Sequence, residues 1–168
     1  SLRGLQPSSV ADSGREAPRA RCTALTHFSG MLRRKAALGL CADIRLPQHA
    51  FTALADSDHE VRSSALTFFL RLAELQPEGG AGVSDGDTIG SIRVLRACFE
   101  QHALMHALAR PLHDAAEVRG VRTRAVELMA CLAATDNPLI HTAMARAGVW
   151  NALVTLVPPC KVAGEHVL

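Results

Sequence analysis

The sequence has no tyrosine and a single tryptophan, and aromatic side chains make up only 4% of its 168 residues. Because 48% of the residues are nonetheless hydrophobic, the core must be built from leucine, alanine, valine and methionine. These residues favour helices, and no alternation of polar and apolar residues typical of strands is found anywhere in the chain. We therefore expect an all-α fold.

Closely spaced cysteines are also missing. None of the five cysteines forms a C-x-x-C pair, which argues against a disulfide framework and against a zinc ribbon. An intracellular, reducing compartment fits this pattern. The cysteines are Cys22, Cys41, Cys98, Cys131 and Cys160.

Long apolar runs and a strong charge are absent as well. No run approaches the roughly 18 to 20 residues of a membrane span, and no signal peptide opens the chain. Eighteen basic and sixteen acidic side chains leave a formal charge of +2, which is too small and too scattered to indicate nucleic acid. We expect protein partners, with no nucleic acid and no membrane.

The composition divides the chain into three parts. Residues 1–20 are rich in Ser, Pro, Gly and Arg, which predicts a linker or disordered end. Residues 21–157 carry the helical patterns, and residues 158–168 form a short tail. The sequence begins with Ser1 rather than Met and ends on the apolar Leu168, so we expect a piece of a longer protein.

Apolar residues recur at helical spacing, and capping signals mark several helix starts. Ser57 and Glu60 have the spacing of a capping box, and Asn137 precedes a proline suited to the first helical turn. Pro111 is expected to end or kink its helix, and residues 76–87 are expected to form a loop. The predicted helices are two short ones within 21–40, a short one from Pro47, and then 57–75, 88–110, 118–134, 139–147 and 149–157.

Two of these helices share the pattern Val-Arg-x-x-Ala-x-x-apolar. The copies begin at Val61 and Val121, and each follows a Leu-x-Asp turn. A pair of such helices cannot bury its apolar stripe alone, so neighbouring units must stack on it. This predicts an armadillo/HEAT-like right-handed superhelical solenoid. In it, Phe68 and Leu128 should be buried at equivalent positions, and Arg62 and Arg122 should pair with the Asp of a neighbouring turn.

Residues with catalytic or metal-binding chemistry form no complete motif. Cys98, His102 and His106 are spaced by four on one helix, but the histidine pair lacks the Glu of a zinc protease. Structural histidines are the preferred interpretation, and we predict no catalytic, cofactor-binding or metal-ligating residues. Trp150 could anchor a peptide if exposed, but core packing is favoured for it.

The order of the motifs resembles the armadillo-like central domain of regulatory subunit 3 of protein phosphatase 4, the SMEK family. Asp58 to Pro77 (DHEVRSSALTFFLRLAELQP), Cys98 to Leu112 (CFEQHALMHALARPL) and Glu127 to Leu156 follow that domain in sequence. The resemblance runs from about Leu46 to Val157. The region of residues 79–87 is shorter than in the family, and Pro158-Pro159 falls where a further helix would stand.

The resemblance implies a non-catalytic scaffold that targets a phosphatase catalytic subunit, together with a second regulatory subunit, to phosphoproteins. It also implies a nuclear or cytoplasmic location. Two alternatives stay open: an unrelated armadillo/HEAT adaptor, and a metal-dependent enzyme that uses His102 and His106.

Overall fold

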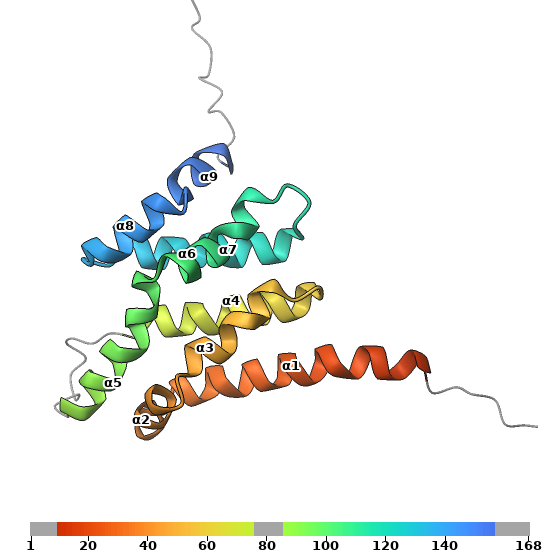
Figure 1. The fold of residues 1–168 in the computed structure, drawn as a ribbon, viewed down its shortest axis with the longest axis horizontal. Coiled ribbons are helices and arrows are strands. Elements are labelled where there is room, and N and C mark those ends of the chain that lie inside the picture. Colours follow the sequence, from red (N-terminus) through yellow and green to blue (C-terminus); the bar gives the residue numbers. More distant parts are fainter. Residues whose placement is uncertain (1–9, 76–85, 157–168) are drawn as a thin grey trace, which may run out of the picture.

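The structure, a computed structural model, describes residues 10–75 and 86–156. Every regular element in these two ranges is a helix, which confirms the all-α expectation (Figure 1). None of the described helices combines the length and hydropathy that crossing a membrane requires. The elements are α1 (Val10–Leu32), α2 (Lys35–Asp43), α3 (Leu46–Phe51), η1 (Thr52–Ala55), α4 (His59–Ala73), α5 (Gly86–Arg96), η2 (Ala97–Glu100), α6 (His102–His113), α7 (Arg119–Ala133), α8 (Pro138–Arg146) and α9 (Val149–Leu156).

The three longest helices, α1, α4 and α7, lie side by side and run in the same direction, with α4 in the middle (Figure 1). The shorter helices connect them and form a second layer. In that layer α2 packs against α5, and α6 packs against α8 and α9. Each step from one long helix to the next therefore passes through short helices on the same side of the molecule.

The cap of α4 differs from the predicted capping box. Asp58, not Ser57, is the N-cap residue, and its Oδ1 accepts hydrogen bonds from the backbone amides of Glu60 at 2.7 Å and Val61 at 3.4 Å. Asp56 Oδ1 accepts from the amide of Asp58 at 2.9 Å and closes the preceding turn. Two aspartates thus accept from the amides of Asp58, Glu60 and Val61 at the start of α4, in place of the predicted exchange between Ser57 and Glu60.

The end of the described chain follows the sequence signals closely. Helix α7 differs from its predicted span by one residue at each end. Asn137 Oδ1 accepts from the amides of Leu139 and Ile140, and Pro138 opens α8, both as predicted. Gly148 separates α8 from α9 with a φ of 70°, a left-handed conformation that glycine adopts without a steric cost. Pro158-Pro159 lie outside the described residues.

The predicted helix 88–110 is wrong as a single element. It divides into α5, η2 and α6, with an extended Gln101 (φ −79°, ψ 122°) between the last two. Pro111 does not end α6, which continues to His113. Proline is tolerated there because it lies in the last turn, where its missing amide removes only one helical hydrogen bond, and its ring is buried. Most of the predicted loop 76–87 lies outside the described residues, and α5 begins at Gly86.

The start of the fold also differs from the prediction. Helix α1 begins at Val10, inside the stretch 1–20 that was expected to be a linker, and it continues to Leu32. Because α2 follows at Lys35, the range 21–40 does contain parts of two helices, as predicted, but the first of them is much longer than expected. Pro18 and Gly30 both lie within it. Once a helix is nucleated, each added residue gains a hydrogen bond, and packing of α1 on α4 outweighs the local cost of these residues. Residues 1–9 are not described.

The two residues predicted to be buried at equivalent positions of α4 and α7 are both in the core. Phe68 and Leu128 are both 0% exposed, and Phe69 contacts Phe68 and Phe99 edge to face, with ring centroids 5.2 and 6.2 Å apart. Trp150, by contrast, is 42% exposed, so the favoured core assignment for it is wrong. It occupies the second position of α9, a short helix that buries Val149 and Ala152 instead.

A third copy of the repeat lies in α1 and was missed in the sequence. Arg21-Cys22-Thr23-Ala24-Leu25-Thr26 matches Arg62-Ser63-Ser64-Ala65-Leu66-Thr67 with no gap, and both match the α7 copy that begins at Arg122. The three arginines therefore mark the same register on three neighbouring helices.

This register defines two apolar stripes on each long helix. The first stripe is buried in α1 (Leu25, Leu32) and in α4 (Leu66, Ala73), but its α7 residues, Val126 and Ala133, are only half-buried. The second stripe is buried in α4 (Val61, Ala65, Phe68, Leu72) and in α7 (Val121, Ala125, Leu128, Leu132), but Ala20, Ala24 and His27 of α1 are exposed. Only α4 buries both stripes, as expected for a helix that lies between two others.

Candidate functional site

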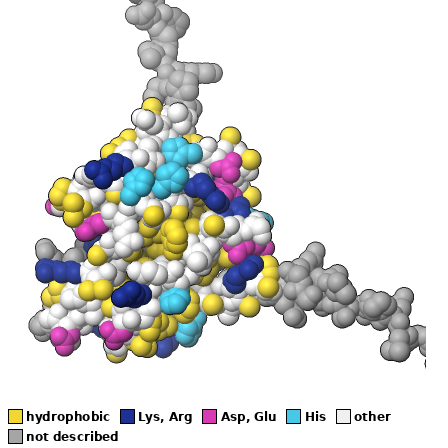
Figure 2. Space-filling view, in the orientation of Figure 1, with side chains coloured by type: hydrophobic (Ala, Val, Ile, Leu, Met, Phe, Trp, Pro, Cys, Tyr) yellow, Lys and Arg dark blue, Asp and Glu magenta, His cyan; other side chains and the backbone are white. Residues whose placement is uncertain are grey.

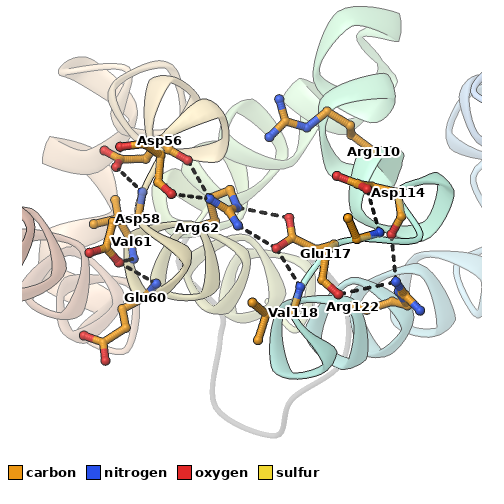
Figure 3. Close-up of polar contacts among 12 residues, drawn as sticks. Asp56, Asp58, Glu60, Val61, Arg62, Arg110, Asp114, Glu117, Val118 and Arg122 are labelled. Carbon is orange, nitrogen blue, oxygen red and sulfur yellow. Dashed lines mark hydrogen bonds and ion pairs between the residues drawn. The ribbon is translucent and has the colours of Figure 1, made fainter.

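An arginine of α4 joins two of the stacked helices. The Arg62 guanidinium donates from Nε and Nη2 to the two carboxylate oxygens of Glu117, at 3.0 and 2.6 Å (Figure 3). Its Nη1 donates to the backbone carbonyls of Asp56 and Ser57, at 2.8 and 2.9 Å. Arg62 thus fixes the turn before its own helix and, through a bidentate ion pair, the turn before α7.

Glu117 is the only charged side chain in the buried class among the described residues, at 8% exposure. Burial by itself raises the pKa of its carboxyl, but hydrogen bonds from Arg62 and from the backbone amide of Val118 outweigh it, so the pKa lies below its usual value. The hydrogen bond to Glu117 likewise raises the pKa of Arg62. Both groups are charged at neutral pH.

An equivalent arginine lies on each of the three long helices, but only the first two form an ion pair with the turn before the next long helix. Arg21 of α1 forms an ion pair with Asp56, in the turn before α4, at 3.1 Å. Arg62 pairs with Glu117 in the turn before α7. Arg122 of α7 donates from Nη2 to the carbonyls of its own turn at Asp114, Ala115 and Glu117 (2.7, 2.9 and 3.3 Å), and its buried Nε has no hydrogen-bond acceptor among the described residues.

The expected pairing of Arg62 and Arg122 with the Asp of a neighbouring turn is therefore corrected. Arg62 forms its ion pair with Glu117, which lies three residues after the aspartate of the turn, Asp114. Asp114 accepts instead from the amide of Ala116 at 2.9 Å, so its carboxylate closes its own turn. Arg122 contacts only carbonyls of its own turn among the residues described.

A groove runs across the exposed faces of α1, α4 and α7. It has a volume of about 490 Å³ and is lined by Thr26, Ser29, Gly30, Arg33, Ser63, Ser64, Thr67, Arg71 and Arg124. We call it the arginine-hydroxyl groove. A second hollow of about 350 Å³ contains Ser63 and Ser64 as well, and extends toward Cys22, His59, Glu60, Val118, Gly120 and Val121. The two hollows share α4 residues and form one continuous surface.

The lining of the arginine-hydroxyl groove has three arginines and no carboxylate. Arg71 and Arg124 form ion pairs with Glu74 and Glu127, each at 2.7 Å, on strongly exposed side chains. Exposed pairs of this kind contribute little free energy, so a ligand can recruit these arginines at small cost. The Arg33 side chain is exposed, and no ion pair or side-chain hydrogen bond joins it to another described residue.

The hydroxyl groups add polar contacts along the same groove. Thr26, Ser29 and Thr67 donate to backbone carbonyls one turn earlier, at 2.9 Å each, which leaves their oxygen lone pairs available as acceptors. Ser63 and Ser64 are half-buried and donate to no described acceptor. The groove can therefore donate to a backbone carbonyl or a carboxylate and accept from a backbone amide.

Outside the arginine-hydroxyl groove, the surface also carries exposed hydrophobic side chains and a small pocket. Figure 2 shows hydrophobic side chains near the centre of one face, with several histidines gathered nearby. A pocket of about 120 Å³ between α3 and α6 is lined by Pro47, Phe51, Leu104 and four further residues. This volume holds one side chain of a partner at most, so the pocket is too small for a cofactor.

The residues considered for zinc do not form a ligand set. His102 and His106 lie beside one another, with ring centroids 6.2 Å apart, and both are exposed. Cys98 is buried, and this burial raises the pKa of its thiol to about 12. Within residues 10–75 and 86–156, no group of three His, Cys, Asp or Glu side chains is placed to hold a metal ion.

Sequence reasoning missed the groove, although its signal was present. Thr26 and Gly30 in α1, and Thr67 and Arg71 in α4, occupy equivalent positions in the register set by Arg21 and Arg62. This third stripe of polar and small residues is shared by α1 and α4, and it becomes visible only when those two copies of the repeat are aligned.

Comparison of the chain with protein families, with curated proteins and with solved structures gives no match.

The buried ion pair predicts how stability depends on pH. Because the pKa of Glu117 is lowered in the folded state, its contribution is fully present above its unfolded pKa of about 4.3 and is lost as pH falls through the folded value. We expect Glu117→Gln to lower the free energy of unfolding by about 2 kcal/mol at neutral pH, with the difference from wild type vanishing in acid. Urea titrations between pH 7 and pH 2 measure this.

The exposed Glu127, paired with Arg124 at 2.7 Å, provides the matched control. Glu127→Gln should change the free energy of unfolding by at most about 0.5 kcal/mol over the same range. An equal effect of the two substitutions would contradict a special role for Glu117.

Proposed function

We propose that the chain is a non-catalytic protein-binding module, built as an armadillo/HEAT-like helical solenoid, that holds extended acidic segments of partner proteins in the arginine-hydroxyl groove. One observation carries the proposal: three arginines and five hydroxyl-bearing side chains, with no carboxylate, line a groove that crosses all three stacked helices. Repeat proteins of this kind bind partners on the extended surface that successive units create.

The solenoid part of the proposal is supported by the register. Three copies of one motif lie on three parallel helices, and the turn before each following helix supplies an acid to the arginine before it. Repeated contacts of this kind between neighbouring units support a solenoid, in which each unit contacts only its neighbours.

The dimensions suit an extended peptide. Packed helices lie about 8 to 10 Å apart, so three of them span roughly 20 Å, which an extended chain crosses in about six residues. Arg33, Arg71 and Arg124 come from α1's end, α4 and α7 in turn, so a carboxylate on alternate residues of such a peptide can reach an arginine from each helix.

We expect a fluorescently labelled Glu-Ser repeat peptide of about ten residues to bind, and a Gln-Ser peptide of the same length to bind at least about tenfold more weakly. The reason is that the groove offers Arg33 and two further arginines whose exposed ion pairs a carboxylate can replace at small cost. Fluorescence anisotropy at low and physiological salt measures this, and binding to the acidic peptide should weaken as salt rises.

Matched variants separate the groove from charge in general. Arg33→Glu and Arg124→Glu should abolish binding, whereas Arg146→Glu, an equal charge reversal on exposed α8, should leave it unchanged. Glu74→Gln and Glu127→Gln release Arg71 and Arg124 and should tighten binding. Equal binding of an oligothymidylate and the acidic peptide would overturn the selectivity for protein segments.

A narrower proposal is that the module belongs to a regulatory subunit of protein phosphatase 4 and targets the catalytic subunit to phosphoproteins. It rests on the order of the motifs in Asp58–Pro77, Cys98–Leu112 and Glu127–Leu156. Under this proposal the full-length protein copurifies with a serine/threonine phosphatase catalytic subunit and a second regulatory subunit. Mass spectrometry of the purified complex measures this, and an associated proteome without a phosphatase would contradict it.

A further inference from the structure

The second hollow of the continuous surface differs in its chemistry from the arginine-hydroxyl groove. It is lined by Cys22, His59, Glu60, Ser63, Ser64, Val118, Gly120 and Val121, and we call it the Gly120 hollow. Its lining has one carboxylate and no lysine or arginine, whereas the lining of the groove has three arginines and no carboxylate. An acidic segment that follows the whole surface therefore meets attractive charge at one end only.

The valine of the Gly120 hollow occupies a position where a polar residue would stabilise the fold. Val118 is the N-cap residue of α7, and no side chain of the described residues caps that helix. Asp58 and Asn137, the N-cap residues of α4 and α8, each accept hydrogen bonds from two backbone amides. Val118 cannot accept such bonds and is 45% exposed, so the start of α7 keeps an apolar side chain on the surface at a cost in stability.

A glycine next to this valine keeps the hollow open. Gly120 is the second residue of α7, and a β-carbon added to it would meet no described atom within 4 Å. At the equivalent register position, two residues before the repeat arginine, α4 has Glu60 and α1 has Arg19. Glycine inside a helix lowers the stability of the helix and lets another chain approach its backbone closely. Gly120 therefore leaves room where the other two long helices carry a long side chain.

The hollow and the groove are close enough for one segment to occupy both. They share Ser63 and Ser64. Along α4, Glu60 of the hollow and Arg71 of the groove are separated by about 16 Å, at about 1.5 Å per helical residue. An extended segment covers this distance in about five residues.

We infer that the Gly120 hollow binds one large apolar side chain of the extended segment whose acidic residues occupy the arginine-hydroxyl groove. This inference rests on the proposed function of the groove and adds a second element of recognition to it. The recognised segment carries a leucine or an aromatic residue about five positions from an acidic one. Its apolar side chain packs against Val118, and the carboxylate of Glu60 disfavours a further acidic residue at that end.

Two labelled peptides test the hollow separately from the groove. One has about four Glu-Ser repeats with a leucine at each end, so it presents the same spacing in either direction of the chain. The other has a serine in place of each leucine. In fluorescence anisotropy with the full chain, the leucine peptide should bind at least about fivefold more tightly, because the hollow removes a leucine side chain from water.

Matched glycine variants locate this gain. Gly120→Leu fills the hollow, and Gly90→Leu adds the same side chain to α5, where an added β-carbon also meets no described atom within 4 Å. Gly120→Leu should remove the preference for the leucine peptide and leave the affinity for the serine peptide unchanged, and Gly90→Leu should change neither affinity. Both variants replace a helical glycine with a better helix former, so both should keep the fold.

Val118→Asp provides an independent variant. An aspartate at this position can cap α7 as Asp58 caps α4, so the melting temperature should not fall. The preference for the leucine peptide should nonetheless be lost. Weaker binding without a loss of stability separates recognition of the apolar side chain from an effect on folding.

Three results would contradict the inference. One is equal affinity for the two peptides, and another is a preference for leucine that survives both Gly120→Leu and Val118→Asp. The third is tighter binding of a peptide with lysine at each end, because Glu60 rather than Val118 would then recognise the segment. Failure of both acidic peptides to bind would instead contradict the groove itself, and this inference with it, so the two proposals fail in different ways.

Discussion

Helix α4 has two apolar stripes, and it can bury both only when a helix lies on each side of it. The structure meets this constraint by placing α1 and α7 in parallel on its two sides. Burying a large apolar side chain contributes roughly 1.5 to 3 kcal/mol, so residues such as Phe68 and Leu66 dominate the stability of the stack. The ion pairs of Arg21 and Arg62 add less energy, but they fix which turn faces which helix.

This arrangement determines which side chains remain on the surface. Helix α4 buries two stripes and α1 and α7 bury one each. The hydroxyl groups and arginines of a further stripe of α1 and α4 therefore remain on the surface and, together with Arg124 of α7, form the groove. The outer helices each have a neighbour on one side, and each leaves one packing stripe open. The proposed groove is thus a consequence of the same register that packs the three long helices.

The sequence predicted those elements whose signals are local. Helix α7 was placed within a residue at each end because Val121, Ala125, Leu128 and Leu132 repeat cleanly, and Asn137 caps α8 as expected. The first half of helix α1 was missed because Pro18 and Gly14 argue locally against a helix, while the stability of α1 comes from contact with α4. The partner of Arg62 could not be predicted, since a Glu 55 residues away becomes its neighbour only through packing.

The central claim is that three copies of one motif lie in register and that only the middle copy is covered on both sides. Six substitutions at equivalent positions test it, with the free energy of unfolding measured by urea denaturation. Ala65→Leu and Ala125→Leu should each cost about 1 to 3 kcal/mol by overpacking, and Ala24→Leu almost nothing. Leu25→Ala and Leu66→Ala should cost about 2 to 5 kcal/mol, and Val126→Ala under about 1. Costs at Ala24 and Val126 as large as those at Ala65 and Leu66 would contradict the stack.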